Sequence, residues 1–280
     1  MGSGEQKTLR RRNMKSIVIT GGTRGIGLGL ARGFLERSCF VTISGKTQES
    51  VERALHELAP FNGKMQAVVA DVRKRGDMEL LLETSVTSFG TVDIWVNNAG
   101  ITHEDRKVWE LDENTVEDVL DSNVLGVIHG TVVPFLAMRE QGGGKIYNME
   151  GLGSDGFIID GMSIYGTTKS ALRYFTRAFA NEAKDSPVLI GSLSPGMVVT
   201  DLLRETVGDD SAESRKKRRF YNMMADDVET VTEFLCEKML TGSGGSQRIQ
   251  WLTKPKIFFR MLTAPFRKRD LFSSEGALKS

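Results

Sequence analysis

The stretch Ser16-Ile17-Val18-Ile19-Thr20-Gly21-Gly22-Thr23-Arg24-Gly25-Ile26-Gly27 decides the fold of this chain. It begins with a β-branched run that predicts a buried strand over Ser16–Thr20, and it ends in a glycine-rich turn. Beyond the turn, apolar residues recur at four-residue spacing from Ile26 to Phe34, which predicts a helix with one apolar face over Ile26–Ser38. The chain therefore opens with a strand, a tight turn and a helix.

The same alternation of short strands and longer helices continues along the chain. Further buried strands are predicted over Phe40–Ser44, Gln66–Ala70, Ile94–Asn97, Lys145–Asn148 and Val188–Ser194. Further helices are predicted over Glu49–Ala59, Asp77–Phe89, Asn114–Glu140 and Ile164–Lys184. This alternation implies an α/β fold, a doubly wound parallel sheet with helices on both faces.

The pattern loosens after Thr200, where a helix over about Asp226–Leu240 and a strand over about Arg248–Leu252 complete the predicted fold. The basic run Arg215–Arg219 is interpreted as a solvated helix face or a mobile lid rather than a nucleic-acid patch. The aromatic and basic stretch Ile257–Phe266 is compatible with packing on its own domain, on a partner subunit or on a membrane surface.

Three regions follow from these patterns. Residues 14–255 are expected to form a single domain, and residues 256–280 a tail that packs on that domain, on a partner or on a membrane surface. Residues 1–13 are polar and basic, with no apolar stretch for a signal peptide, so we expect a disordered segment or a remnant of targeting or cloning. No apolar run approaches the length needed to span a bilayer.

The bulk composition excludes several classes of protein. A chain of 280 residues, 40% hydrophobic and 26% charged, fits one large soluble α/β domain. The net charge of +1 gives no global attraction to nucleic acid or to an anionic membrane. The two cysteines, Cys39 and Cys236, exclude a disulfide framework and a cysteine-rich zinc site, and the three histidines have no metal-binding spacing. No metal site is therefore expected.

Glycines open the helix that follows the first strand. Glycine at such positions permits a tight turn and lets backbone amides approach a pyrophosphate at the helix N-terminus. The spacing is G-x-x-x-G-x-G rather than the G-x-G-x-x-G fingerprint, but its position after the first strand predicts a dinucleotide site. The residues expected to bind the cofactor from this turn are Gly21, Thr23, Arg24, Gly25, Ile26 and Gly27.

The end of the second predicted strand indicates which dinucleotide is bound. An acidic residue there would bind the ribose 2′-hydroxyl of NAD and repel a 2′-phosphate. This chain has no acid at that place, and Lys46 follows the strand with Thr47 beside it. Lys46 and Arg24 can both offer positive charge to a 2′-phosphate, so the sequence predicts NADP(H).

Two further strand ends carry candidate cofactor contacts. The third strand is followed by Asp71 and Val72, where a carboxylate can accept a hydrogen bond from the adenine amino group. The fourth strand is followed by Asn98, Ala99 and Gly100, and small residues there would let the cofactor lie against the backbone.

The pair Tyr165 and Lys169 supplies the candidate chemistry. Residues four apart share one face of a helix, so Lys169 lies one turn from the tyrosine. A nearby ammonium favours the phenolate and is expected to lower the tyrosine pKa toward the working pH. The same lysine can hold ribose hydroxyls, and the phenol can give a proton to a carbonyl that receives a hydride. Of the four tyrosines in the chain, Tyr165 alone has a lysine at this spacing.

Taken together, these motifs resemble the short-chain dehydrogenase/reductase family over about residues 14–205. The resemblance rests on Thr20–Gly27, Asp71, Asn97–Gly100, Asn123, Tyr165, Lys169 and Ser194-Pro195-Gly196 with Thr200. It implies a Rossmann-like sheet in which the tyrosine is the acid/base, the lysine supports it, and Asn123 holds a relay water. It also implies that Pro195, Gly196 and Thr200 contact the nicotinamide end of the cofactor.

The chain departs from the family at the catalytic serine, which most members place about thirteen residues before the tyrosine. Position 152 is Leu, and its neighbour is Gly151. Ser154, eleven residues before Tyr165, is the candidate for polarising the substrate carbonyl. Ser163 is an alternative, although its position in the helix should direct it to another face.

The altered segment Asn148–Gly156 resembles the Asn-Met-Asp-Gly-x-Gly-Ser segment of plant and algal chlorophyll(ide) b reductases. That branch reduces the C7 formyl group of chlorophyll b to a hydroxymethyl group. The resemblance implies a wide apolar mouth, for which Phe220–Met224 and Phe258–Phe266 are candidates. It also implies a chloroplast location, in the stroma or at the thylakoid surface with contact to the membrane or a light-harvesting complex; the alternative is the cytoplasm.

Other interpretations remain open at this point. The chain can be a reductase of the same family acting on another carbonyl compound, such as a lipid, a retinoid or an oxoacyl compound. It can also be a dinucleotide-binding scaffold with little turnover. The family commonly pairs its long helices, here Asn114–Glu140 and Ile164–Lys184, so the resemblance implies a homo-oligomer.

Overall fold

A computed structural model describes residues 14–158, 160–200, 212–242, 247–264 and 269–272. Seven strands form one sheet in the order β3-β2-β1-β4-β5-β6-β9, and every neighbouring pair is parallel. The strands are β1 (Ser16–Ile19), β2 (Phe40–Gly45), β3 (Met65–Val69), β4 (Ile94–Asn97), β5 (Gly144–Met149), β6 (Val188–Ser194) and β9 (Arg248–Gln250). The predicted doubly wound α/β fold is therefore confirmed.

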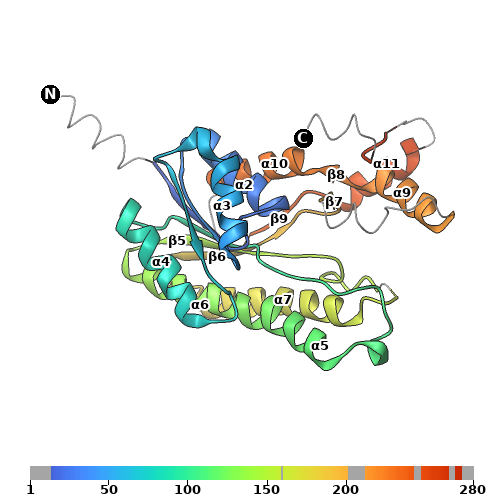
Figure 1. Cartoon of the computed structure of the whole chain (residues 1–280), viewed down its shortest axis with the longest axis horizontal. Helices are drawn as coiled ribbons and strands as arrows, with labels where there is room; N and C mark the ends of the chain where they lie inside the picture. Colours follow the sequence, from blue (N-terminus) through green and yellow to red (C-terminus); the bar gives the residue numbers. More distant parts are fainter. Residues whose placement is uncertain (1–13, 159, 201–211, 243–246, 265–268, 273–280) are drawn as a thin grey trace.

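Helices cover both faces of the sheet (Figure 1). One face carries α2 (Gly25–Glu36), α3 (Gln48–Glu57) and α10 (Val228–Thr241). The other carries α4 (Arg75–Phe89), α6 (Gly126–Glu140) and α7 (Ser163–Glu182). Each face has its own apolar core, which explains why the strands are buried runs rather than alternating ones. Two short 3₁₀ turns, η1 (Ala59–Phe61) and η2 (Val108–Glu110), lie in the connections.

The long predicted helix Asn114–Glu140 is one helical run made of three parts. It consists of α5 (Glu113–Leu120), a π-helical segment η3 (Asp121–Leu125) and α6. The run is long and apolar enough to cross a bilayer by length and composition, which corrects the expectation that no such run exists. Half of its most apolar window is buried, and α6 packs on the sheet beside α4, so we interpret it as a core helix.

The carboxyl-terminal part forms a separate small layer beside the main sheet. Its elements are β7 (Val198–Val199), β8 (Asp226–Asp227), α9 (Ala212–Met224) and α11 (Lys254–Thr263). The basic run predicted as a helix face lies on α9. Residues 1–13 and 201–211, and residues 265–268 and 273–280 of the predicted tail, lie outside the described residues, so the domain division stays a prediction.

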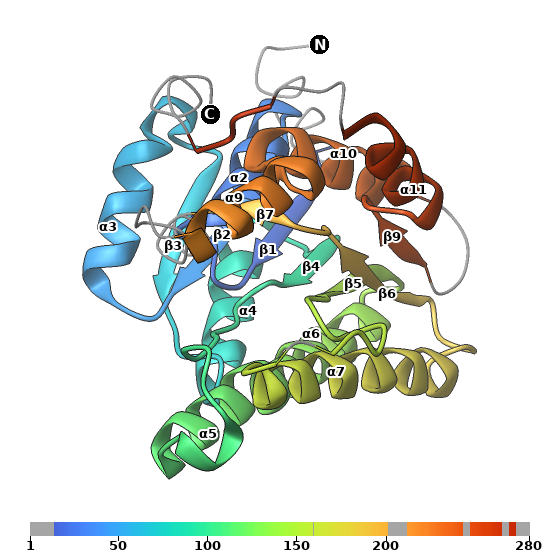
Figure 2. The ribbon, with the colours of Figure 1, turned by 90° about the vertical axis from the view of Figure 1, so that its right-hand side faces the viewer.

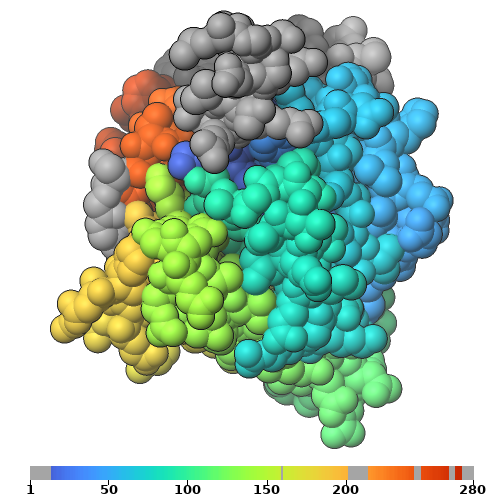
Figure 3. Space-filling view, turned by 90° about the vertical axis from the view of Figure 1, so that its left-hand side faces the viewer, coloured from blue at the N-terminus to red at the C-terminus, as the bar shows by residue number. Residues whose placement is uncertain are grey.

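The strand order places a topological switch between β1 and β4. In doubly wound sheets the crevice at the carboxyl ends of such strands is where ligands bind. Figure 2 faces this end of the molecule, where the loops after β1, β4, β5 and β6 converge under α9. Figure 3 shows the opposite end, where the turn before β5 lies against the segment before β4. There the Gln141 side chain binds both backbone groups of Val92, at 2.7 Å to the oxygen and 3.5 Å from the nitrogen.

Candidate active site

The turn between β1 and α2 is a cradle that requires its glycines. Gly21 and Gly25 have positive φ angles, 62° and 53°, which L side chains rarely adopt. A Cβ atom on Gly27 would lie 2.2 Å from the carbonyl oxygen of Gly21. The α2 N-terminus has no side-chain cap and no acidic residue in its first turn. Its free amides and positive dipole end therefore fit a pyrophosphate.

The loop after β4 closes the other side of this cradle. The Asn98 side chain donates to the carbonyl oxygens of Thr20 and Gly21, at 3.0 and 2.9 Å. The Thr20 hydroxyl accepts from the backbone of Asn98 and Ala99, at 3.1 Å each. A Cβ atom on Gly21 would lie 2.8 Å from the Ala99 Cα. The predicted cofactor residues of the two loops are thus held together at the switch point.

Thr23 is buried and Ile26 is half-buried, so their side chains support the turn from within the protein rather than face a ligand. The methyl group of Thr23 would lie 2.6 Å from a Cβ on Gly45, at the end of β2, and Ile26 packs on the core. The contact brings the β1 turn beside the end of β2. Arg24, next to Thr23, and Lys46, next to Gly45, are both exposed there. Their placement fits the predicted 2′-phosphate contact.

Asp71 has a partner that sequence reasoning did not foresee. Its carboxylate accepts from the Arg73 side chain, at 2.6 Å from Nη2 and 3.0 Å from Nε, and lies 4.0 Å from the Lys46 Nζ. Hydrogen bonding from Arg73 lowers the pKa of this carboxyl. A bond to the adenine amino group would have to use the remaining acceptor capacity. That role, and the contact predicted for Val72, stay predictions.

Asn123 lies in the π-helical segment η3 and is fully buried. Its Nδ2 donates to the Ile101 carbonyl at 2.9 Å and to the Thr168 hydroxyl at 3.1 Å, while its Oδ1 accepts from the Ile101 amide at 2.8 Å. The side chain therefore ties the loop after β4 to α7. Short π segments inside α-helices are frequent at functional sites.

Tyr165 and Lys169 converge on this cluster from α7. The Lys169 Nζ lies 5.5 Å from the centre of the Tyr165 ring and 3.5 Å from the Met149 carbonyl oxygen. A Cβ atom added to Gly100 would lie 3.4 Å from the Lys169 Nζ and 3.0 Å from the Asn123 Oδ1. The structure therefore brings Asn123, Tyr165, Lys169 and Gly100 together, as predicted.

The pKa values differ from the sequence-based expectation. Burial raises the pKa of Tyr165 to about 12, whereas the neighbouring ammonium was expected to lower it. Burial also lowers the pKa of Lys169 to about 8. The physical reason is desolvation, because burial penalises the charged form of each side chain and this outweighs the attraction between them. Tyr165 therefore holds its proton at neutral pH, as a proton donor must.

The position beside the tyrosine hydroxyl is occupied by Gly151. A Cβ atom on Gly151 would lie 2.5 Å from the Tyr165 hydroxyl and 3.0 Å from the Lys169 Cε. Spacing alone had pointed to Leu152 as the site of the missing serine. The structure places Gly151 there instead, one residue earlier. Ser163, the alternative candidate, is exposed at the first position of α7.

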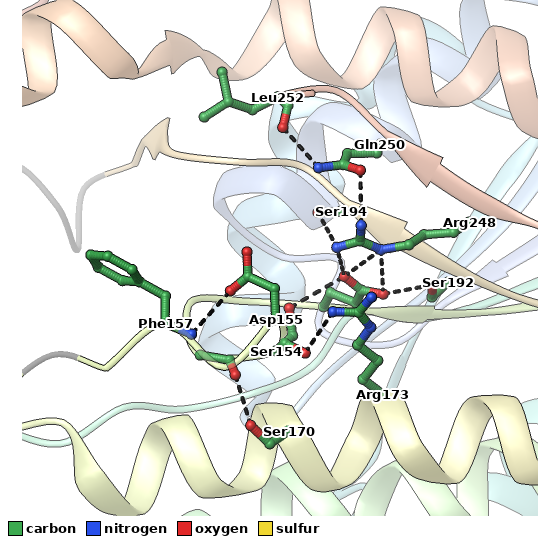
Figure 4. A network of polar contacts seen from close by, with 12 residues as sticks. Ser154, Asp155, Phe157, Ser170, Arg173, Ser192, Ser194, Arg248, Gln250 and Leu252 are labelled. Carbon is green, nitrogen blue, oxygen red and sulfur yellow. Dashed lines mark hydrogen bonds and ion pairs between the residues drawn. The ribbon is translucent and has the colours of Figure 1, made fainter. Parts of the chain in front are cut away.

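Ser154 points into a polar network centred on Glu150 (Figure 4). Its hydroxyl donates to the Glu150 carboxylate at 3.2 Å, and the Ser192 hydroxyl donates to the same group at 2.8 Å. Arg248, from β9, binds that carboxylate through Nη2 at 2.6 Å and Nε at 2.9 Å. The Glu150 side chain is almost completely buried. To polarise a substrate carbonyl, the Ser154 hydroxyl would have to give up its hydrogen bond to Glu150.

The remaining predicted residues lie at the edge of the same crevice. Thr200 packs against the glycine turn, its methyl group 3.3 Å from a Cβ on Gly25. Gly196 has a positive φ of 73°, and Pro195 beside it is buried. The ring of His103 accepts from the Tyr165 amide at 3.4 Å. Since no N-cap side chain serves α7, His103 supports the start of that helix.

No cluster of three or more His, Cys, Asp or Glu side chains that could hold a metal ion occurs among the residues whose placement is described. Cys39 and Cys236 are both buried, and desolvation raises the pKa of the Cys39 thiol to about 11. Neither is a reactive thiolate at neutral pH.

A family model described as short chain dehydrogenase matches residues 15–211. The chain therefore belongs to the short-chain dehydrogenase family, a family of oxidoreductases that use nicotinamide dinucleotides. The cradle between β1 and β4 and the cluster around Tyr165 fit this class. The predicted family resemblance is confirmed.

Curated relatives include chlorophyll(ide) b reductases. The chain is 31% identical to the probable chlorophyll(ide) b reductase NYC1, chloroplastic, of Oryza sativa subsp. japonica, over 94% of this chain and 54% of that protein. It is 31% identical to the chlorophyll(ide) b reductase NOL, chloroplastic, of Arabidopsis thaliana, over 89% of this chain and 73% of that protein. The chain spans about half the length of the NYC1 relatives.

Among solved structures, the fold is similar to L-sorbose reductase from Gluconobacter frateurii, solved in complex with NADPH and L-sorbose. The TM-score is 0.74 at 21% sequence identity, over 85% of this chain and 95% of that one. This likeness supports the fold.

Proposed function

We propose that this protein is an NADPH-dependent reductase that converts an aldehyde on a large apolar molecule to an alcohol. The proposed substrate is chlorophyll(ide) b, whose C7 formyl group would become a hydroxymethyl group. The observation that carries the proposal is the cluster of Tyr165, Lys169 and Asn123 beside the glycine cradle. The chlorophyll(ide) b reductases among its relatives support the choice of substrate.

Bound NADPH would supply the hydride, and the chain supplies the remaining steps. Gly21, Gly25 and Gly27 would hold the pyrophosphate against the α2 N-terminus, and Arg24 and Lys46 the 2′-phosphate. Tyr165, protonated because its pKa is about 12, would give its proton to the alkoxide oxygen. Lys169 would hold the ribose hydroxyls.

Asn123 would hold the loop after β4 against α7, so that the cofactor and the tyrosine keep their relative positions. Holding a relay water remains a predicted role of this residue. The Glu150 network would fix the segment between Gly151 and Ser154 beside the phenol. A glycine at position 151 lets the Tyr165 hydroxyl and the Lys169 side chain approach the backbone closely, which a larger residue would prevent.

The surroundings of the site suit a wide, flat substrate. Lys107 pairs with Asp160 at 2.5 Å, and Lys217 of α9 pairs with Asp105 at 3.8 Å, so the loops 101–111 and 151–162 meet under α9. Large apolar side chains stand exposed on these loops, Trp109 at 79% and Ile158 at 90%. Exposed apolar side chains around a polar site favour an apolar ligand.

The predicted lining is only partly supported. Phe220 is exposed on α9, but Met224 is buried and packs on the protein itself. Phe258 and Phe259 are exposed on α11 and belong to the surface described below rather than to the loops around Tyr165.

The decisive experiment is to incubate the protein with chlorophyllide b and NADPH and to follow the absorbance spectrum. The proposal expects a shift to that of the 7-hydroxymethyl product, with the loss of the NADPH absorbance. Tyr165→Phe should abolish the shift while NADPH still binds. A spectrum that does not change, with NADPH consumption on another aldehyde or ketone, would leave the general reductase and reject this substrate. NADPH binding without turnover on any carbonyl would favour the scaffold interpretation.

We further propose a chloroplast location, because the names of the chlorophyll(ide) b reductases carry it. Homo-oligomer formation through the long helices also stays a proposal. Leu120, Leu125 and Leu136 of that helical run and Tyr174 of α7 are exposed, which is compatible with such pairing.

A further inference from the structure

Helix α11 presents its apolar side outward. Phe258, Met261 and Leu262, spaced to share one helix face, are 71%, 58% and 64% exposed. The side chain that the helix buries is a cation, Arg260, at 6% exposure. Globular helices normally bury the apolar stripe and expose the charge. The arrangement is therefore the reverse of that of a helix that serves its own core.

A set of polar contacts fixes α11 in this orientation. Arg260 binds the Asp226 carboxylate at 2.5 Å and the Met224 carbonyl at 2.6 Å. Asp226 also accepts from Trp251 at 2.6 Å and from Arg269 at 3.0 Å. A buried carboxylate and guanidinium that satisfy each other this fully resist rotation, because an unpaired buried charge is very costly. The apolar face is thus held outward.

Basic side chains surround this face. A groove of about 970 Å³ runs between α9 and α11, and Figure 2 shows the two helices on the same side of the molecule. The basic residues that line it are Arg215, Lys216, Arg218 and Arg219 of α9, together with Arg260 and Arg269, which pair with Asp226; Asp270 also lines it. Lys216 and Arg219 are exposed, and Lys254 is exposed at the start of α11. Since the whole chain has a net charge of only +1, the positive charge is concentrated locally.

The groove is distinct from the catalytic crevice. Lys217 of α9 reaches toward the loop around Asp105, next to the active site. Arg215 and Arg219 lie two residues to either side of Lys217, which turns them to the opposite side of the helix at about 100° per residue. The basic groove therefore opens away from Tyr165.

We propose that the face formed by α9 and α11 docks on the surface of an anionic lipid bilayer. Phe258, Met261 and Leu262 would enter the boundary between headgroups and acyl chains, and the basic groove would bind lipid phosphates. An apolar helix face with basic residues beside it is the arrangement that binds membrane surfaces, and each surface cation adds about 1 kcal/mol. Docking in this way would hold the protein at a membrane surface through its α9 and α11 face, on the side away from Tyr165.

The test uses the full chain and vesicle sedimentation. Vesicles of phosphatidylcholine with about 30 mol% phosphatidylglycerol are compared with pure phosphatidylcholine, at low and high salt. The expected result is binding to the anionic vesicles, weak binding to the neutral ones and loss of binding at high salt. Absence of binding by the wild-type protein, or equal binding to both vesicles, would overturn the proposal.

Two double variants separate the contributions. Phe258→Ser with Leu262→Ser should weaken binding by about a hundredfold or more, since two large apolar side chains lose their burial in the bilayer. Lys216→Ala with Arg219→Ala should weaken it by roughly tenfold or more. Leu80→Ser, which removes an apolar side chain 49% exposed on α4, is the matched control and should bind like wild type.

Circular dichroism and the unfolding midpoint confirm that each variant is folded. The alternative is that a second copy of the chain, rather than a lipid bilayer, covers this face. Analytical ultracentrifugation tests this by measuring the oligomeric state. If Phe258→Ser with Leu262→Ser breaks an oligomer while vesicle binding is absent or unchanged, the face is a protein interface and the lipid proposal is wrong.

Discussion

A methyl group added to Gly151 would lie 2.5 Å from the hydroxyl oxygen of Tyr165. No such contact is tolerated without movement, so Gly151→Ala should displace the phenol. We expect kcat to fall by about tenfold to a hundredfold, because a shift of about 1 Å in a catalytic group can cost that much. Steady-state kinetics with NADPH and an accepted aldehyde measure it, and NADPH affinity should change little.

The matched control for this substitution is Gly76→Ala on α4, where an added Cβ has no neighbour within 4 Å. It should leave kcat unchanged and slightly raise stability, by about 1 kcal/mol or less. Wild-type turnover in Gly151→Ala would show that the tyrosine does not act from the position seen here.

Ser154→Ala tests whether the displaced serine polarises the substrate. Because the Ser154 hydroxyl donates to Glu150, we expect kcat to stay within a factor of about three and the free energy of unfolding to fall by about 1 kcal/mol. The two measurements are turnover and urea unfolding. A loss of about a hundredfold in kcat, with stability unchanged, would assign the carbonyl contact to Ser154 after all.

Arg24 and Lys46 are expected to select the phosphorylated cofactor. The double variant Arg24→Gln with Lys46→Gln should raise KM for NADPH by about tenfold or more, since two charge-assisted contacts are lost. KM for NADH should change by less than about twofold. Arg32→Gln, which changes an exposed arginine within α2, serves as the control. Equal effects on both cofactors would contradict the predicted preference.

Lys169 should make stability depend on pH. The pKa of its ammonium falls from 10.5 to about 8 on folding, so between these values the unfolded chain binds more protons than the native one. The free energy of unfolding should therefore rise with pH over that window, by up to about 1.4 kcal/mol per pH unit from this residue. Urea unfolding of wild type and Lys169→Met between pH 7.5 and 10 measures the difference. Parallel pH profiles would mean that the lysine is not buried as an uncharged group.

The sheet was accessible from sequence because its strands are continuous apolar runs bounded by turns. Predicted strand ends agree with the observed ones within a residue or two, as in β4 and β6. The location of the site residues that follow strands could also be predicted, because parallel strands bring the residues after them to one edge of the sheet. The positions of the strands alone therefore place Gly21, Asn98 and Gly100 at the same edge.

Contacts between distant segments left no local signal. Glu150 and Arg248 are 98 residues apart, and nothing in the segment Asn148–Gly156 indicates that Arg248 pairs with Glu150. Nor does the sequence reveal that Arg73, only two residues further on, folds back onto the carboxylate of Asp71. The π-helical segment around Asn123 was missed for a different reason: one wide turn barely disturbs an apolar pattern with a period of 3.6.

The tyrosine pKa shows where reasoning from spacing fails. Four residues of separation place Lys169 on the same face as Tyr165, but they do not say which atoms meet or how much water remains. Desolvation outweighs the attraction expected from the ammonium, and this balance depends on packing around both side chains.

The bond between Glu150 and Arg248 bears on where the chain can be cut. The family match ends at residue 211, yet Arg248 lies beyond it on β9. A fragment trimmed at that boundary would keep Glu150 buried with two serine hydroxyls and no counter-charge. Removing one partner of a buried ion pair costs about 3–5 kcal/mol, a large share of the net stability of a typical domain. The smallest autonomous folding unit therefore extends at least through β9, and expression of shorter pieces should give insoluble or unfolded protein.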